Sequence, residues 1–254
     1  MNDQSVPTKP GFWERQFKGP RTSNQTIFDV AFGIVLPLFC FKFDPLVFTG
    51  GVGEGPLLQN YQLFAYMFSG LEMVALAFWL VRGLRSSLLN AFVGGVLLAG
   101  GIFSSVLGAV LVPYSLLGLL FVIGILGFTP FVTAFVFFRN AFRSLQDGGR
   151  EDYEPRPSMV LLGWLLPLSA TFFLSTGLDD YMQKSVNDMI YGNEQQAWAA
   201  ARHLRPLSLI NKTKCEVLVT DFQLTTDPQR KEHLQKLYKE ATGEEIQPQI
   251  RYVD

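Results

Sequence analysis

The stretch LLNAFVGGVLLAGGIFSSVLGAVLV, residues 88–112, contains no charged side chain and decides the fold. A helix needs about 20 predominantly apolar residues to cross the hydrocarbon core of a bilayer. This stretch is long enough, and its apolar residues follow one another without the polar face that a helix on a soluble protein carries. It therefore predicts a membrane-spanning helix.

Four further apolar segments are similar to residues 88–112 in length and composition. They are residues 27–48, 61–81, 116–138 and 159–176, and the last of them contains Pro167. A soluble domain rarely holds five such segments, because its helices need a solvated face. The sequence therefore predicts an all-α polytopic membrane protein with five transmembrane helices.

Lys and Arg residues occur in alternate connections between these segments. The 26-residue N-terminal arm is basic, and so are the connections after the second and fourth segments, whereas residues 49–60 and 113–115 have no Lys or Arg. Basic connections stay on the cytoplasmic side of a plasma membrane or bacterial inner membrane. This pattern predicts a cytoplasmic N-terminus and an extracytoplasmic C-terminus, and it counts Arg139 and Arg143 as cytoplasmic topology signals.

The chain divides by composition into three parts. Residues 1–26 form a cytoplasmic arm, residues 27–177 the transmembrane bundle, and residues 178–254 an extracytoplasmic module with mixed charge. Within that module, residues 194–204 are predicted as a helix, and CEVLVTDF, residues 215–222, as a strand because it is short and rich in Val and Leu. Asp227 and Pro228 are typical of a helix start and Gly243 of a helix end. The tail is therefore predicted as a small α/β module.

Small residues recur four positions apart in the third predicted span. This spacing lets helix backbones approach closely, and small residues on several faces indicate a central helix. The residues predicted to pack in this way are Gly95, Ala99, Gly100, Gly101, Ser104, Ser105 and Gly108.

Glu72, near the middle of the second predicted span, is the sharpest candidate for chemistry. A carboxylate at this depth costs roughly 2.5–3.5 kcal/mol on insertion scales, so it needs a partner or water. Lys42 and Asp44, in the outer part of the first span, are its candidate ionisable neighbours. Two interpretations remain open: a proton or cation site, or a carboxyl group that joins two helices. Asp29 lies at the start of the first span, where the positive end of the helix dipole is expected to stabilise its carboxylate.

The remaining signals exclude several functional classes. A net charge of −1 gives no basis for nucleic-acid binding, both histidines lie in the tail, and no catalytic, metal-binding or cofactor-binding motif is present. The leading hypothesis is a non-enzymatic membrane scaffold or accessory subunit. Its expected partners are the lipid bilayer and another membrane subunit or a second copy of the chain. The alternative is a small transporter or a proton- or cation-coupled channel component that uses Glu72.

Overall fold

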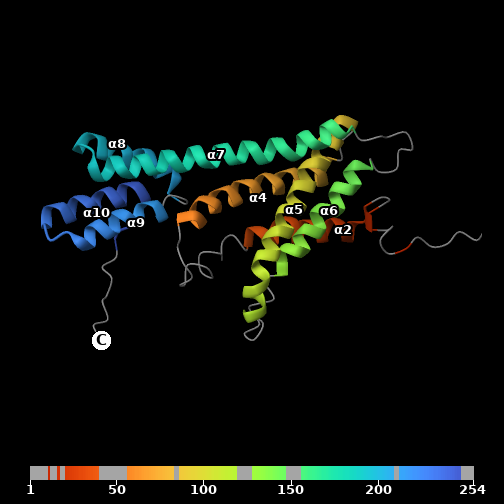
Figure 1. Cartoon of the computed structure of the whole chain (residues 1–254), viewed down its shortest axis with the longest axis horizontal. Helices are drawn as coiled ribbons and strands as arrows, with labels where there is room; N and C mark the ends of the chain where they lie inside the picture. The colour runs from red at the N-terminus through yellow and green to blue at the C-terminus, as the bar shows by residue number, and fades with distance from the viewer. Residues whose placement is uncertain are drawn as a thin grey trace, which may run out of the picture. The chain divides into compact units, whose positions relative to one another are not determined.

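A computed structural model gives the arrangement of the chain (Figure 1). It describes residues 11, 16–17, 21–39, 56–82, 86–118, 128–146, 156–208 and 212–246. The structure is all-helical, with 91% helix and no strand among these residues. The helices are α2 (Ser23–Val30), η1 (Ala31–Val35), α4 (Pro56–Arg82), α5 (Ser87–Gly118), α6 (Thr129–Leu145), α7 (Pro157–Tyr191), α8 (Glu194–Leu204), η5 (Arg205–Leu207), α9 (Lys212–Leu224) and α10 (Pro228–Thr242).

The chain forms two compact units. Unit 1 comprises Met1–Glu54 and Ala65–Phe172, and unit 2 comprises Gly55–Phe64 and Phe173–Asp254. Helices α4 and α7 each contribute residues to both units.

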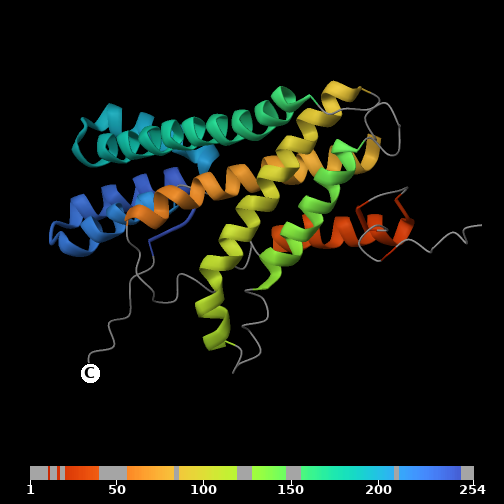
Figure 2. The ribbon, with the colours of Figure 1, turned by 45° about the vertical axis from the view of Figure 1, so that its right-hand side comes forward.

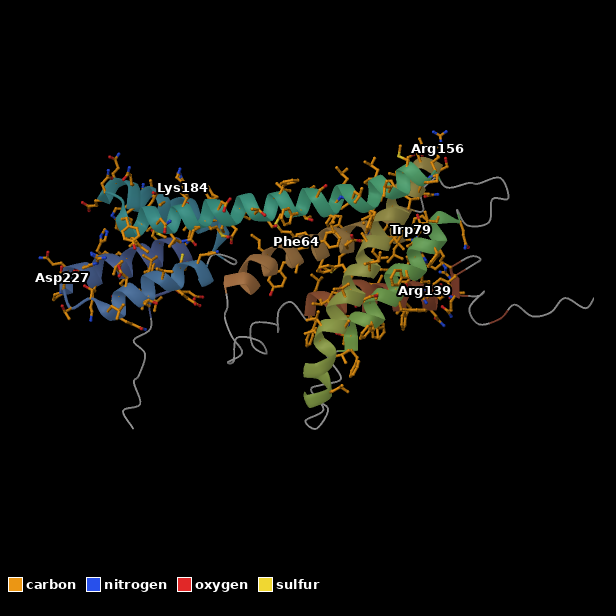
Figure 3. All side chains as sticks on the ribbon, viewed as in Figure 1. Phe64, Trp79, Arg139, Arg156, Lys184 and Asp227 are labelled. Carbon is orange, nitrogen blue, oxygen red and sulfur yellow. The ribbon has the colours of Figure 1, made fainter. Side chains whose placement is uncertain are left out.

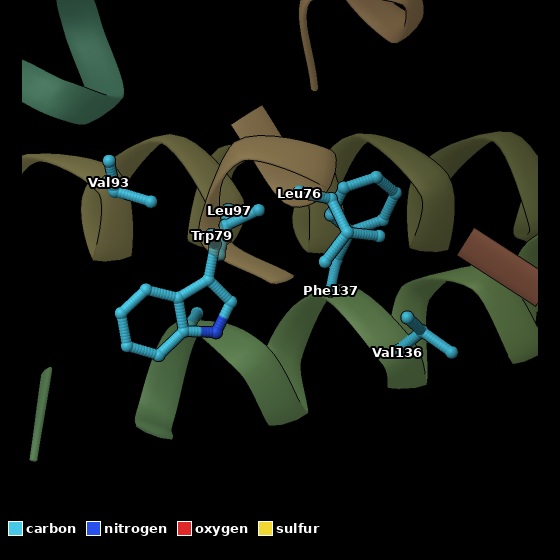
Figure 4. Close-up of a cluster of buried hydrophobic side chains, with 7 residues drawn as sticks. Leu76, Trp79, Val93, Leu97, Val136 and Phe137 are labelled. Atoms are coloured by element: carbon cyan, nitrogen blue, oxygen red, sulfur yellow. The ribbon is translucent and has the colours of Figure 1, made fainter. Parts of the chain in front are cut away.

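The core of unit 1 lies where α4, α5 and α6 meet. Helices α5 and α6 run side by side in both views of the ribbon (Figures 1 and 2). Apolar side chains from the three helices fill the space between them (Figure 4), namely Leu76, Trp79, Val93, Leu97, Val136, Phe137 and Ala141. This cluster fixes the position of α6, which carries the polar residues considered below.

Three helices are long and apolar enough to span a membrane, among the residues that the structure describes: Leu63–Val81, Ser87–Val112 and Pro157–Tyr191. Large apolar side chains on these helices are exposed, such as Val74 at 69%, Val110 at 60% and Phe173 at 72%. Exposed apolar surface of this extent is stable in lipid rather than in water. The chain is therefore a membrane-embedded protein.

Five spans are not shown. The first predicted span corresponds to a shorter apolar helix, Ser23–Phe39, and the rest of that span lies outside the described residues. Of the fourth predicted span, residues 116–118 belong to the end of α5 and residues 119–127 lie outside the described residues. Its last part lies in α6, which continues past residue 138 to Leu145. The turn predicted at residues 113–115 is wrong, because α5 continues through Pro113 to Gly118.

The described part of unit 2 is built from the start of α4, the end of α7, and α8, α9 and α10. Its buried residues include Met182 and Val186 of α7, Ala201 of α8, Leu218 of α9 and Leu237 of α10. A capping box at Asn193 starts α8, and Gly243, with φ +83°, ends α10 in the left-handed conformation that glycine adopts easily.

The strand predicted at residues 215–222 is wrong, and the described tail is helical rather than α/β. These residues lie within α9. Cys215 and Leu218 are fully buried and Phe222 is half-buried, whereas Val217 is 49% exposed. Burial at intervals of three and four residues is the period of a helix, and a half-buried strand would bury alternate residues instead. Packing of Cys215 and Leu218 in the core of unit 2 therefore overrides the strand preference of the valines.

Candidate functional site

Glu72 lies on α4 within unit 1 and is buried against α5. Its side chain is 1% exposed. It faces Gly100: a Cβ atom added to this glycine would come within 2.9 Å of the Glu72 carboxyl carbon. The Gly100 backbone is the polar group that acts on the carboxyl group, but neither carboxyl oxygen makes a hydrogen bond of normal geometry with a described residue. Glu72 is therefore enclosed in helix packing.

The structure does not test the predicted neighbours of Glu72. Lys42 and Asp44 both lie outside the described residues. Among the described residues, no Lys or Arg forms an ion pair with Glu72. Beside the site, the rings of Phe68 and Phe103 meet edge to face, with centroids 5.1 Å apart. Phe68 and Glu72 are four residues apart on α4, and Phe103 lies three residues after Gly100 on α5, so these rings lie one helical turn from the carboxyl group.

The small residues of α5 lie against several neighbours. Gly95 faces the backbone of Val160 on α7, and in the reverse direction Gly163 of α7 faces the backbone of Phe92 on α5. Gly101 and Gly108 face the rings of Phe138 and Phe131 on α6, respectively. Ala99, like these glycines, is buried, whereas Ser104 and Ser105 are half-buried. The Ser105 hydroxyl donates to the Gly101 carbonyl 2.8 Å away, within its own helix.

A second polar site, which sequence reasoning did not identify, joins α2 to α6. The Asp29 carboxylate forms an ion pair and a hydrogen bond with the guanidinium of Arg139. Asp29 is fully buried and Arg139 is 3% exposed. Figure 3 shows Arg139 where α6 meets α2. Arg21 is the second cation, with its Nε 3.9 Å from the Asp29 carboxylate.

Amide side chains extend this network. Arg21 donates to the Asn140 side-chain oxygen at 2.8 Å, and Arg139 donates to Gln16 at 2.8 Å. Arg143 donates to Gln25 at 2.9 Å. We call Arg21, Asp29, Arg139 and Arg143, with these three amide residues, the arginine cluster.

The position of the arginine cluster follows from how α6 is held. Thr133 of α6 donates to the carbonyl oxygen of Phe32 at 2.9 Å, and Ser144 of α6 donates to that of Asn90 on α5 at 2.8 Å. The two hydrogen bonds hold α6 near its start and near its end, and the arginine cluster lies between them. Aromatic rings cover the guanidinium of Arg139, which lies 5.2 Å from the ring centre of Phe28 and 5.3 Å from that of Phe135.

Like charges act on one another within the arginine cluster. Burial lowers the pKa of Arg143, which lies outside the three candidate spans, and the charges of Arg139 and Arg21 lower it further. Burial is also the main reason why the pKa of Arg21 is lowered, and there the Asp29 charge acts in the opposite direction. Among the described residues, Asp29 is the carboxylate whose charge opposes this repulsion at both Arg21 and Arg143.

The sequence held a weak signal for this cluster. Arg139 and Arg143 are four positions apart and share one helix face with Asn140 nearby, which is unusual at the end of an apolar helix. The sequence interpretation treated both arginines as topology signals and did not consider that Arg139 pairs with Asp29. The structure also corrects the role of Asp29, because the carboxylate is held by Arg139 rather than by the start of its helix.

Unit 2 has an open depression on its surface. Residues at the end of α7, the start of α8 and the first half of α10 line it, including Glu194, Arg230 and His233. The ring of His233 also meets Trp198 edge to face, with centroids 6.2 Å apart. An open surface with charges of both signs differs from the enclosed pockets that bind small substrates. Within the described residues, no group of three or more His, Cys, Asp or Glu residues is arranged to hold a metal ion.

No protein-family model matches this sequence, and comparisons with curated proteins and with solved structures found no match.

Proposed function

We propose that the protein is a non-enzymatic membrane scaffold or accessory subunit that presents unit 2 to another membrane subunit or to a second copy of the chain. The observation that carries this proposal is the helical module of unit 2, which has its own buried core and yet leaves large apolar side chains outside it, of which Tyr191 and Leu224 are the most exposed. Tyr191 is 83% exposed and Leu224 is 76% exposed. Tyrosine is a common anchor of protein interfaces, and an apolar side chain near it adds to the area that a partner can bury.

Charged residues near Tyr191 support the same function. Arg230 of α10 pairs with Asp221 of α9 at 2.7 Å, and Arg230 lines the same surface depression as Ile190 and Gly192, the residues on either side of Tyr191. An apolar centre with a polar rim is the common composition of a protein interface. The proposed arrangement in the membrane has the N-terminus in the cytoplasm and unit 2 outside, as the alternation of basic connections favours.

Site-specific photo-crosslinking in intact cells tests the interaction. A photoreactive residue replaces Tyr191 or Leu224 in the full chain, with Lys236 as the control position because its side chain is exposed but polar. We expect one discrete crosslinked species from the first two positions and none from the third. Leu224→Asp should remove the species obtained from position 191 without changing the amount of folded protein. Crosslinks of equal strength at all three positions, or at none, would contradict the proposal.

Chemical labelling tests the orientation. A cysteine at position 236, in a chain with Cys40→Ser, should react with a membrane-impermeant maleimide in intact cells. The remaining thiol, Cys215, is buried. Labelling of position 236 only after lysis would place unit 2 in the cytoplasm and would overturn the proposed topology.

Proton- or cation-coupled transport through Glu72 is a second candidate function. The observation that favours it is a carboxyl group that is 1% exposed and has no hydrogen bond of normal geometry to a described residue. Ionisable groups inside membranes are often part of ion pathways. The scaffold is the better-supported function because Glu72 is packed closely against Gly100 and is almost fully buried.

A further inference from the structure

Tyr191 lies between two residues that line the open depression of unit 2. Ile190 and Gly192 both belong to the lining, whereas the side chain of Tyr191 is 83% exposed. Its ring therefore does not fill the depression of its own chain. A projecting aromatic ring and a depression lie next to each other on one surface.

The depression has an apolar floor and a charged rim. Met189 of α7 and Leu234 of α10 line it, and each is only 3% exposed. Glu194 of α8 and Arg230 of α10 also line it, and both are exposed. This arrangement suits a tyrosine side chain, because the ring is apolar and the hydroxyl group at its tip needs a polar partner.

The two rim charges have opposite signs, so this surface is complementary to itself. In a two-fold pair every contact occurs twice, because a residue that meets a second residue of the other copy is also met in the reverse direction. Glu194 of each copy can then face Arg230 of the other, and complementary charges of this kind select one orientation of two surfaces. Asp221 holds Arg230 in place through an ion pair of 2.7 Å within the same copy.

We propose that the partner of unit 2 is a second copy of this chain, and that the two copies pair about a two-fold axis. Tyr191 of each copy enters the depression of the other, and Glu194 of each copy meets Arg230 of the other. This inference deepens the proposed function and rests on it, because it names the partner that unit 2 is proposed to bind. The competing occupant of the depression is a different membrane subunit.

Co-expression of two differently tagged full-length chains tests whether the partner is a second copy. One chain carries a photoreactive residue at position 191. After irradiation of the membranes, the product is isolated with the tag of that chain and probed for the tag of the other. We expect one product, at twice the mass of the chain, with both tags. A discrete product without the second tag would overturn self-pairing and leave the proposed function intact, whereas the absence of any product would overturn both.

Exchange of the rim charges tests the two-fold arrangement. Glu194→Arg in both chains, or Arg230→Glu in both chains, should lower the yield of the doubly tagged product about tenfold, because like charges then meet at two symmetry-related positions. When one chain carries Glu194→Arg and the other carries Arg230→Glu, opposite charges meet again at both positions, and the yield should return to nearly that of the wild type. No recovery in this mixture, with both variants folded, would overturn the pairing of Glu194 with Arg230.

Arg202→Glu is the matched control for the charge variants. Arg202 is also an exposed arginine of unit 2, but it lies eight residues after Glu194, about 12 Å along α8. This variant should leave the yield unchanged, and an equal loss would show a response to net charge and overturn the proposed arrangement. The co-expression experiment with the native rim charges decides whether the partner is a second copy even if a charge variant does not fold.

Discussion

The Asp29 carboxylate is paired with the guanidinium of Arg139, a residue 110 positions further along the chain. Both side chains are buried, and aromatic rings cover the guanidinium. The pair links α2 to α6, and α6 packs in turn against α5. Removing one member of a buried ion pair leaves an uncompensated charge, which costs about 3–5 kcal/mol.

Asp29→Asn should therefore destabilise the full-length protein by about 3–5 kcal/mol, because Arg139 would lose its carboxylate inside the protein. Arg139→Gln should cost less, since Arg21 remains 3.9 Å from Asp29. The double variant should be more stable than the sum of the two losses predicts. Unfolding in detergent measures all three. Glu232→Gln is the control: it breaks an exposed pair with Lys236 and should change nothing measurable. Strict additivity in the double variant would show that the pair contributes no coupling.

Gly163→Ala should lower the yield of folded protein. A Cβ atom at this position would collide with the backbone of Phe92, so α5 and the first part of α7 would have to separate. Overpacking of this kind costs about 1–3 kcal/mol. Gly70→Ala on α4 is the matched control, because its added Cβ would meet no atom within 4 Å beyond its chain neighbours and the backbone of its own helix. Alanine also favours the helix over glycine by about 1 kcal/mol. Equal unfolding temperatures for the two variants would show that this face of α5 tolerates bulk.

Several features could be read from the sequence because they depend on short-range composition. The continuous apolar character of residues 88–112 predicted a spanning helix, and Asp227, Pro228 and Gly243 predicted the ends of α10. These signals are local, so one sequence is enough to read them. The strand prediction at residues 215–222 failed because the preference of a short Val- and Leu-rich segment depends on what it packs against.

The arginine cluster could not be predicted in the same way. It brings together residues from the N-terminal arm, α2 and α6, and pairing over such separations is decided by helix packing rather than by spacing in the sequence. The environment of Glu72 could be predicted only in part. Its position inside an apolar segment indicates that it is buried, but its contact with Gly100 depends on how α4 packs against α5.

Asp227→Ala should weaken the start of α10 by about 0.5–2 kcal/mol. The Asp227 carboxylate accepts a hydrogen bond from the backbone N–H of Gln229 at 3.0 Å. Hydrogen exchange of the α10 amides in the full chain measures the loss, which should be largest in the first turn. Thr226→Ala, one position earlier, should leave the exchange rates unchanged. If instead Thr226→Ala speeds exchange more than Asp227→Ala does, the cap belongs to Thr226.

Cys215 should be protected from alkylation in the folded protein. Burial raises the pKa of its thiol from 9.0 to about 12, so the reactive thiolate is scarce at neutral pH. Because the folded state holds this proton more tightly, its contribution to stability is intact below about pH 9 and is lost as the pH rises towards 12. The unfolding midpoint of a Cys40→Ser chain should therefore fall more steeply over this range than that of Cys40→Ser, Cys215→Ala. Rapid maleimide labelling of Cys215 under native conditions would show that unit 2 opens locally.

Glu72→Gln separates the two candidate functions. Gln keeps the size of the side chain and removes the titratable proton. If Glu72 only fills the contact between α4 and α5, the variant should fold and assemble as the wild type does. Glu72→Leu should then also be tolerated, because replacing a buried polar group that lacks a good hydrogen bond by an apolar one is nearly neutral or stabilising. If Glu72 carries a proton or cation, reconstituted vesicles should show a pH-dependent flux in the wild type that Glu72→Gln abolishes while the protein stays folded. We expect no such flux, because the carboxyl group is almost fully buried and packs closely against Gly100. A flux that disappears in Glu72→Gln would replace the scaffold by a transporter.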